Sequence, residues 1–224
     1  MKKKYGRRNF INTAIAGGIG LGLSNSFSAL YAQSGASQKR IGIIGLDTSH
    51  SIAFTKALNA AGASADFKGY KVVAAYPKGS NDIISSAERI PGYTEEVKKL
   101  GVEIVSSIKE LLKKTDYILL ETNDGRLHLQ QALEVIKAGK PMFIDKPIAA
   151  SLKDAVAIFK AAEQNKVPVF SSSSLRFMTS AQEVAKGKVG KVLGADCYSP
   201  AHLEKTHPDL FWYGIHGVET LFTV

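Results

Sequence analysis

The sequence predicts an α/β protein built on a doubly wound parallel sheet. Short apolar runs, rich in β-branched residues, alternate along the chain with stretches of helical spacing, and short loops separate the two. Parallel strands need a long crossover connection, which a helix usually provides. Because such crossovers are right-handed, successive helices fall on both faces of the sheet. The chain has 224 residues and 45% hydrophobic content, which is enough for one full core.

Six strands are expected from apolar runs at residues 40–45, 70–76, 102–105, 116–121, 141–146 and 167–171. Helical spacing predicts helices between them, at residues 51–61, 94–100, 107–114, 127–138 and 151–164. Ser107 followed by Glu110 predicts a capping box at the start of one helix, and Ser151 is expected to cap another. Together these elements make up a first domain at residues 39–177.

The pattern changes after residue 177. Residues 190–198 are expected to form a strand of a different layer, and residues 210–224 a helix. One strand and one helix cannot cover each other's apolar faces, and the last four residues offer no polar closure. We therefore expect residues 178–224 to be the truncated start of an α/β substrate domain, and the sequence to be a piece of a longer protein.

Residues 1–38 have the layout of an export signal followed by a linker. A basic start precedes an apolar, glycine-rich middle and a segment of small and polar residues. Arg7 and Arg8, followed by Phe10 and Ile11, are typical of a twin-arginine signal, whose route carries folded proteins across the membrane. The sequence thus predicts an exported, periplasmic protein with no stable membrane insertion once the signal is removed. An uncleaved amino-terminal anchor is the alternative.

The charge gives no reason to expect nucleic-acid binding. The formal net charge is +9, from 29 basic and 20 acidic residues, and five of the basic residues lie within the first eight positions. Without these five, 24 basic residues face 20 acidic ones, which is an ordinary soluble surface. Cys197 is the only cysteine, which excludes an intrachain disulfide and a cysteine-based metal cluster.

The segment 141–147 predicts a lysine at the carboxyl edge of the sheet. Its apolar residues run into Asp145 and Lys146, and Pro147 has no N–H to continue a ladder, so a buried strand must end there. In open α/β sheets, ligands lie at this edge. A lysine held there and partly dehydrated can exchange a proton with a substrate hydroxyl. The alternative is a simple ion pair between Lys146 and Asp145 or another acid.

Several short motifs follow one another in a fixed order: the first strand with its Gly45 turn, residues 122–124 with His128, and residues 138–141, 145–147 and 175–177. This ordered set resembles that of the Gfo/Idh/MocA oxidoreductases. Residues 187–191 and 214–216 resemble the second domain of that family. The resemblance covers the chain from about residue 40 to its end. Its most specific part is the lysine before Pro147, although the family usually has glutamate where Asp145 stands.

The resemblance implies an NAD(P)-binding Rossmann domain followed by an α/β domain for substrate binding and subunit contacts. It implies NAD or NADP as cofactor, a sugar, cyclitol or related polyol as substrate, and a homo-oligomer when the protein is full length. Lys146 would lie near the nicotinamide and the substrate, and His216 would be the acid/base, unless it is a core or capped histidine. The cofactor would contact Gly45, Asp47, Thr48, Ser49, His50, Thr122, Asn123, His128, Asp145, Lys146 and Arg176.

The first turn departs from the family pattern. The dinucleotide fingerprint has three glycines, and Asp47 and His50 stand at its second and third places. A carboxylate is therefore expected to face the diphosphate, with Thr48, Ser49 and the helix amino terminus as remaining donors. The acid that should end the second strand is also missing. Lys78 and Ser80 stand near that place and could meet the 2′-phosphate of NADP or be solvated.

The region around the acid/base histidine also departs from the family pattern. Trp212 stands where the family often has the aspartate that orients the histidine, and Asp209 or Glu219 could replace that aspartate. Tyr198 and Trp212 could stack on a sugar face or be core and interface aromatics. His202 and His207 are expected in a solvated loop rather than as ligands.

Two other functions share these features. One is a glycosidase that uses tightly held NAD to oxidise, eliminate and restore the sugar. The other is a carbohydrate-binding protein that kept the fold and lost the cofactor, which Asp47, His50 and Tyr76 favour. No metal site is predicted, because a lone aspartate and histidine in the first turn are a poor metal signature.

Overall fold

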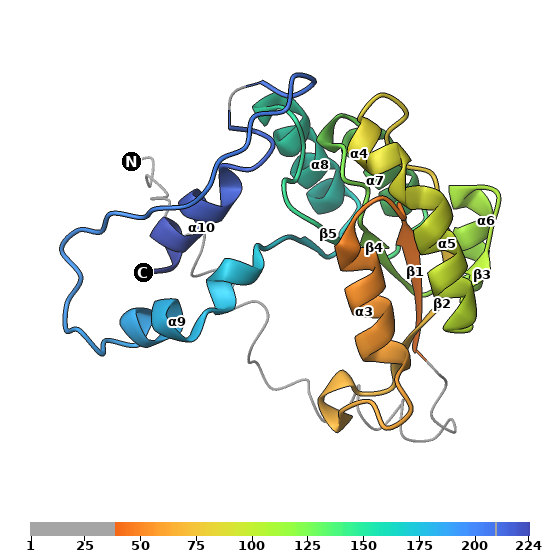
Figure 1. Cartoon of the computed structure of the whole chain (residues 1–224), viewed down its shortest axis with the longest axis horizontal. Coiled ribbons are helices and arrows are strands. Elements are labelled where there is room, and N and C mark those ends of the chain that lie inside the picture. The colour runs from red at the N-terminus through yellow and green to blue at the C-terminus, as the bar shows by residue number, and fades with distance from the viewer. Residues whose placement is uncertain (1–38, 209) are drawn as a thin grey trace. The chain divides into compact units, whose positions relative to one another are not determined.

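The computed structural model describes residues 39–208 and 210–224, and its centre is a six-stranded parallel sheet (Figure 1). The strand order is β3-β2-β1-β4-β5-β6, the order of a doubly wound sheet whose direction switches between β1 and β4. The predicted fold class is confirmed. The predicted export signal at residues 1–38 lies outside the described residues. The strands are β1 (Lys39–Ile44), β2 (Tyr70–Tyr76), β3 (Glu103–Ile104), β4 (Tyr117–Leu120), β5 (Met142–Ile144) and β6 (Val169–Phe170).

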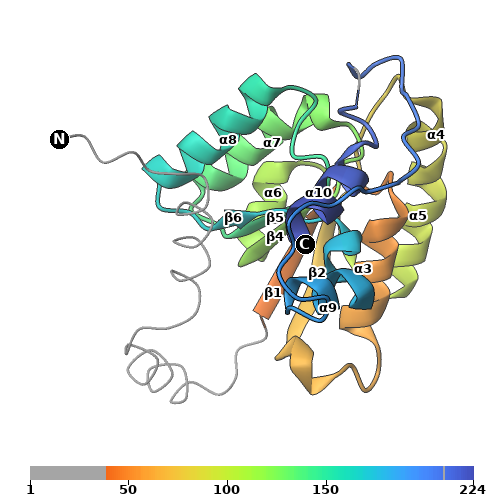
Figure 2. The same ribbon diagram turned by 90° about the vertical axis from the view of Figure 1, so that its left-hand side faces the viewer.

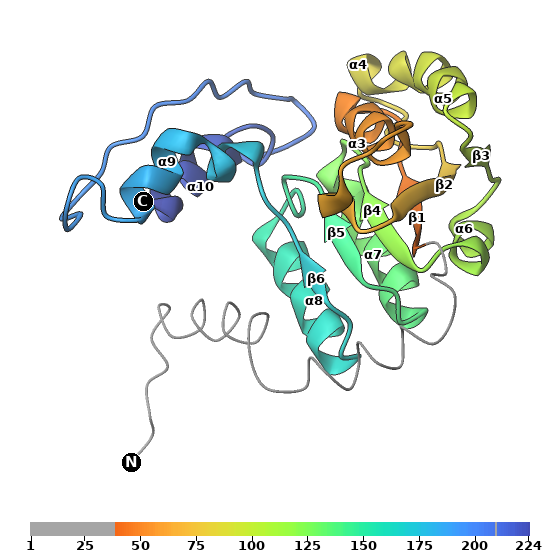
Figure 3. The same ribbon diagram turned by 90° about the horizontal axis from the view of Figure 1, so that it is seen from below.

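Helices cover both faces of this sheet. Figure 2 shows α6, α7 and α8 on one side and α3, α4 and α5 on the other, and Figure 3 shows the same layers from below. Among the described residues, no helix has the length and apolar character needed to span a membrane. The α-helices are α3 (Ser49–Asn59), α4 (Ile84–Ala87), α5 (Arg89–Lys99), α6 (Ile108–Lys114), α7 (Gly125–Lys137), α8 (Leu152–Gln164), α9 (Thr179–Ala185) and α10 (Ile215–Thr223), and two 3-10 helices are η1 (Ala65–Phe67) and η2 (Ser174–Phe177).

Alternation along the central strand β1 divides the core in two. Ile41 and Ile43 are buried in the cluster under α3 and α5, whereas Ile44 belongs to the larger cluster under α6, α7 and α8. Each fully buried aliphatic side chain of this kind stabilises the fold by about 1.5–3 kcal/mol. The core therefore fixes where β1 ends, and with it the turn that starts at Gly45.

Serine caps start two of the helices where the sequence predicts them. The Ser107 hydroxyl accepts from the Glu110 N–H at 3.2 Å, and the Ser151 hydroxyl accepts from the Asp154 N–H at 3.1 Å. The capping box is only half formed, because the Glu110 carboxylate accepts from the N–H and hydroxyl of Ser106, each at 3.0 Å, rather than from the N–H of Ser107.

One helix is longer than predicted. The sequence predicts residues 94–100, whereas α5 begins at Arg89, and the short α4 before it was not predicted. Pro91 lies in the first turn of α5, where a residue has no intrahelical partner for its N–H, so the proline does not interrupt the helix.

The segment after residue 177 differs more from the prediction. Residues 190–198 form no strand and are mostly exposed, because no strand of the described part of the chain lies beside them to accept their hydrogen bonds. The predicted final helix is confirmed in its second half as α10, and α9 was not predicted. Both helices pack against η2, which holds this segment next to the end of β6.

Gly45 shows why the first turn needs a glycine. Its φ is +92°, and a Cβ there would lie 2.5 Å from the backbone N and Cα of Thr122. The turn after β1 thus passes directly against the turn after β4. The glycine is required by contact between two backbones, whatever ligand the protein binds.

Replacing Gly45 by alanine should therefore destabilise the fold by more than about 2 kcal/mol, since positive φ alone costs a non-glycine residue about 1–2 kcal/mol and the overlap adds to it. Gly139→Ala is the matched control: Gly139 also has positive φ, +69°, but no atom lies within 4 Å of an added Cβ. We expect urea unfolding to show a cost near 1 kcal/mol for the control. Equal losses in both variants would contradict the proposed backbone contact.

Candidate functional site

A polar cavity of about 330 Å³ lies at the carboxyl ends of the central strands. Its walls come from the start of α3, the ends of β4 and β5, the α4–α5 junction and the loop before α10. The cavity brings together five of the predicted site residues. Its lining residues are Thr48, Ser49, His50, Ser85, Arg89, Asn123, Lys146, His202, Trp212 and Tyr213.

Lys146 lies at the cavity wall, directly after β5. The Asp145 N–H still donates to the Leu120 carbonyl at 2.8 Å, so strand pairing reaches Asp145 and stops before the lysine, as the sequence predicts. The lysine side chain is 11% exposed, and its Nζ lies 3.5 Å from Asp145 Oδ2. A nearly buried ammonium is little screened by water, so its charge acts strongly on any group in the cavity.

His50 and Asp145 form a close pair across the ends of two strands. His50 Nδ1 lies 2.8 Å from Asp145 Oδ2, and the Asp145 side chain is only 6% exposed. Burial alone would raise the pKa of Asp145, but His50 and Lys146 together hold that pKa below its usual value. Asp145 is therefore ionised and holds both neighbours in place.

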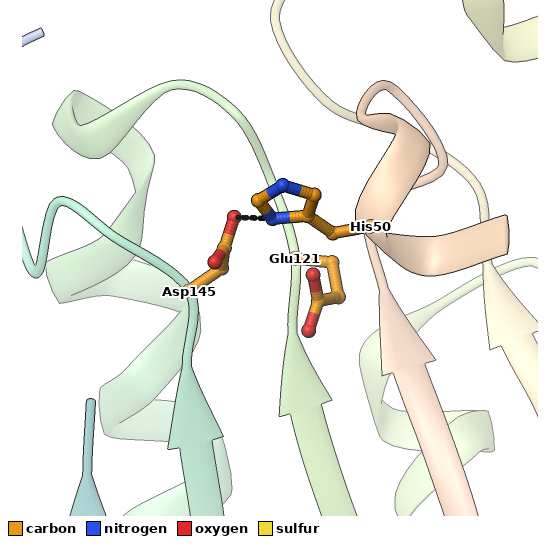
Figure 4. A group of neighbouring side chains, drawn as sticks. All are labelled: His50, Glu121 and Asp145. Carbon is orange, nitrogen blue, oxygen red and sulfur yellow. Dashed lines mark hydrogen bonds and ion pairs between the residues drawn. The ribbon is translucent and has the colours of Figure 1, made fainter. Parts of the chain in front are cut away.

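Glu121 is the functional candidate that sequence reasoning missed. It follows β4 directly and is 0% exposed, and neither carboxylate oxygen has a hydrogen-bond partner among the residues that the structure describes. Burial, and then the charge of Asp145, raise its pKa well above the usual value. Figure 4 shows the side chain pointing toward His50 and Asp145. The sequence does contain a pattern that could have identified Glu121: an acid directly after an apolar strand, as Asp145 is after the next strand along the chain.

Asp47 corrects the expectation that a carboxylate faces the diphosphate. Its side chain is 0% exposed and turned into the protein. Oδ1 accepts from the Asn123 N–H at 3.0 Å, and Oδ2 accepts from the Ser80 N–H at 3.2 Å. Burial raises the pKa of Asp47, while the two N–H groups oppose that shift. This carboxylate joins the loop after β2 to the loop after β4.

Three other predicted cofactor residues are absent from the lining of the polar cavity. His128 is fully buried, with Nδ1 3.0 Å from the Ile148 carbonyl and Nε2 2.6 Å from the Thr122 carbonyl. Arg176 forms an ion pair with Glu219 at 2.6 Å. Thr122 itself is only 1% exposed. His128 and Thr122 are therefore buried in the protein interior, whereas the Arg176 side chain is 48% exposed.

His216 lies next to the cavity. Its Nδ1 is 2.7 Å from the Ser173 hydroxyl, and its ring centroid is 4.8 Å from that of Tyr213, which lines the cavity. Burial, and then the charge of Lys146, lower the pKa of His216 below its ordinary value of 6.5. The ring is therefore neutral near pH 7 and able to accept a proton.

The structure tests one of the two residues expected to orient His216. Glu219 accepts from the Ser173 N–H at 2.7 Å and does not take the place of an orienting aspartate, and Asp209 lies outside the described residues. The Ser173 hydroxyl takes that role. No sequence pattern could point to Ser173, because it lies 43 residues before the histidine.

The expectation of a solvated loop is wrong for His207. Its side chain is buried, its Nε2 lies 3.4 Å from Asp124 Oδ1, and its ring centroid is 4.8 Å from that of Trp212. Burial lowers the pKa of His207. Tyr198, by contrast, is fully exposed, and Trp212 lines the polar cavity.

A second, apolar cavity of about 440 Å³ adjoins the same pair of side chains. His50 and Asp145 line it together with Phe54, Phe143 and Phe170. The rings of Phe54 and Phe143 are 5.9 Å apart, and those of Phe143 and Phe170 are 5.2 Å apart. His50 therefore stands between a polar and an apolar cavity.

The polar cavity suits an anionic nucleotide phosphate. The amino terminus of α3, with the exposed Ser49, forms one wall, and Arg89 and Lys146 add positive charge. With Asp47 turned away, the wall presents no carboxylate from the first turn. The residues present therefore fit the phosphate part of a dinucleotide, although two of the three fingerprint glycines are replaced.

Comparisons with known proteins agree with this architecture. Residues 39–173 match the family model for the Gfo/Idh/MocA oxidoreductases, described as an oxidoreductase family with an NAD-binding Rossmann fold. A 1,5-anhydro-D-fructose reductase from Ensifer adhaerens is 30% identical over 129 residues, which are 54% of this chain and 38% of the reductase.

Solved structures show the same fold. An NAD-binding protein from Listeria innocua has a TM-score of 0.61 at 19% identity, over 84% of this chain and 55% of that protein. The WlbA dehydrogenase from Bordetella pertussis, solved with NADH and UDP-GlcNAcA, has a TM-score of 0.53 at 20% identity, over 68% of this chain and 43% of that protein. The chain thus spans about 38–55% of the length of these relatives.

The lowered pKa of His216 leads to a test of the site geometry by NMR. We expect the His216 ring protons to titrate below 6.5, and Lys146→Met to raise this pKa, because removing the ammonium removes a charge that opposes protonation. The signal is assigned by its loss in His216→Asn. Lys137→Met, at an exposed position in the last turn of α7, is the control and should leave the titration unchanged. If Lys146→Met also leaves it unchanged, the two side chains do not share one site.

Proposed function

Because the chain belongs to the oxidoreductase family with an NAD-binding Rossmann fold, we propose that it forms the cofactor-binding part of an NAD(P)-dependent oxidoreductase. The proposed substrate is the hydroxyl of a sugar, cyclitol or related polyol. The name of the 1,5-anhydro-D-fructose reductase supports a carbohydrate substrate, and it concerns a protein that this chain matches over part of its length. The full-length protein is proposed to be a homo-oligomer.

The observation that carries the proposal is the pairing of a nearly buried lysine with a neutral histidine. Oxidation of an alcohol removes a hydride from carbon and a proton from oxygen, and bound NAD(P) supplies the hydride acceptor. His216, whose pKa is lowered, is suited to take the proton. The ammonium of Lys146 is suited to stabilise the negative charge that develops on the substrate oxygen.

The choice between NAD and NADP depends on the loop after β2. Ser80 does not serve a 2′-phosphate, because it is 1% exposed and its hydroxyl donates to Asp82 at 2.9 Å. Lys78 is the remaining basic side chain in that loop, and no acid is available for the ribose hydroxyls between Tyr76 and Ser80. This combination favours NADP if Lys78 turns toward the ribose.

Location is part of the proposal. The basic, apolar and small-residue layout of residues 1–38, with its paired arginines, supports export to the periplasm through the twin-arginine route. That route carries folded proteins, so a cofactor bound in the cytoplasm would travel with the protein. Net oxidation and NAD-dependent glycoside cleavage would both use this arrangement.

The cofactor is tested directly by mass spectrometry of the nucleotide released on denaturing full-length protein purified from the periplasmic fraction. We expect NAD or NADP in about one copy per chain, or saturable binding of one of them to the emptied protein in a fluorescence titration. If neither nucleotide is released or bound, the carbohydrate-binding alternative is favoured.

The lysine is tested by Lys146→Met in the full-length protein. Turnover should fall by at least about 100-fold, because one group that stabilises the oxyanion is lost, while the circular dichroism spectrum stays close to that of the parent. Lys137→Met on the exposed face of α7 serves as the charge-matched control. Near-normal turnover in Lys146→Met would remove the lysine from the mechanism and leave the fold assignment intact.

A further inference from the structure

The carboxylate of Glu121 is buried without a hydrogen-bond partner in the described part of the chain. It is 0% exposed, and neither oxygen accepts a hydrogen bond from the described residues. Burying an ionised carboxylate without a hydrogen bond or a cation is strongly unfavourable. A second acid, Asp145, lies beside it and increases the cost, and the nearby charge of Lys146 offsets only part of it. The position therefore calls for a bound cation or a retained proton.

The neighbours of Glu121 form the rest of a coordination sphere. One ligand atom from each of His50, Glu121 and Asp145 lies within 4.8 Å of the other two, and His50 Nδ1 and Asp145 Oδ2 are already 2.8 Å apart. Around an ion with bonds of about 2.0–2.2 Å, adjacent ligand atoms are roughly 3 Å apart. Small side-chain movements would bring all three onto one ion.

The three ligands come from rigid parts of the fold. Glu121 and Asp145 follow the neighbouring strands β4 and β5, which pair as far as Leu120 and Ile144, and His50 lies in the first turn of α3 (Figure 4). Two adjacent strand ends and one helix start hold the three side chains at a fixed spacing. Such a preorganised set favours binding because little ordering is required.

We propose that His50, Glu121 and Asp145 bind a divalent transition-metal ion. An imidazole with two carboxylates is a donor set for Mn²⁺ or Zn²⁺, whereas Ca²⁺ and Mg²⁺ prefer oxygen ligands alone. The two carboxylates neutralise the charge of the ion. Three protein ligands also leave a coordination position open, as in catalytic rather than structural metal sites.

The three ligand residues lie beside the cavities that the proposed oxidoreductase would use. His50 lines both cavities and Lys146 lines the polar one, with its Nζ 3.5 Å from the ligand residue Asp145. An oxygen atom of a ligand that reaches this ion would be polarised by it. Binding of the ion does not depend on the proposed function, because the three ligands are complete without a cofactor.

The test is metal binding by the full-length protein after treatment with a chelator. Titration with MnCl2 or ZnCl2 by calorimetry should show one saturable site per chain, and the same ion should raise the melting temperature. CaCl2 should bind at least tenfold more weakly. These measurements need neither a cofactor nor a substrate, so they can fail while the oxidoreductase proposal stands, and the reverse also holds.

Two variants separate a metal ligand from a protonated acid. Glu121→Gln should weaken metal binding at least tenfold, and so should His50→Gln, whose side chain is 39% exposed and thus tolerates replacement if the buried variant fails to fold. Glu134→Gln, an exposed change of the same chemistry on α7, should bind like the parent. Absence of saturable binding, or equal binding by His50→Gln and the parent, would overturn the site and leave Glu121 as a carboxyl group that retains its proton.

Discussion

The constraint on which this structure depends is the burial of three carboxylates at one edge of a parallel sheet. Asp47, Glu121 and Asp145 all lie below the polar cavity, and each is less than 5% exposed. A buried carboxylate must be compensated by N–H groups, a cation or a proton. Asp47 is met by two backbone N–H groups and Asp145 by His50 and Lys146, whereas Glu121 accepts no hydrogen bond from the described residues and is offset only in part by the charge of Lys146. The chemistry of the site follows from this unequal compensation.

The same compensation shapes the cavity. Asp47 stands at the place of a fingerprint glycine, and its side chain joins the loops after β2 and β4 by hydrogen bonds. The side of the same turn that lines the cavity presents Ser49 and His50. Because Asp145 holds Lys146 near the strand end, the ammonium stays at the cavity wall. The departures from the glycine pattern therefore change how the turn is supported, and the positive wall remains available to an anion.

Local patterns predicted most of the fold. The apolar runs gave the six strands, the serine caps gave two helix starts, and Pro147 marked the end of β5 beside the lysine. Predictions that needed a distant partner were less successful. Residues 190–198 have the composition of a strand but no neighbour to pair with, and His207 lies in a polar loop yet is buried against Trp212. The periodicity of apolar residues indicates which secondary structure a segment can form, but it does not indicate which other segment packs beside it.

The sequence by itself determined the order of strands and helices, the glycine at the first turn and the placement of Lys146 at a strand end, because spacing, β-branching and proline act within a few residues. Only the tertiary structure decided which charges meet. His50 and Asp145 are 95 residues apart in the chain, and Asp47 and Asn123 are 76 apart. Pairing of β1 with β4 and of β4 with β5 brings those turns to one edge, and a low-dielectric edge then requires each buried charge to be compensated by whichever group lies next to it.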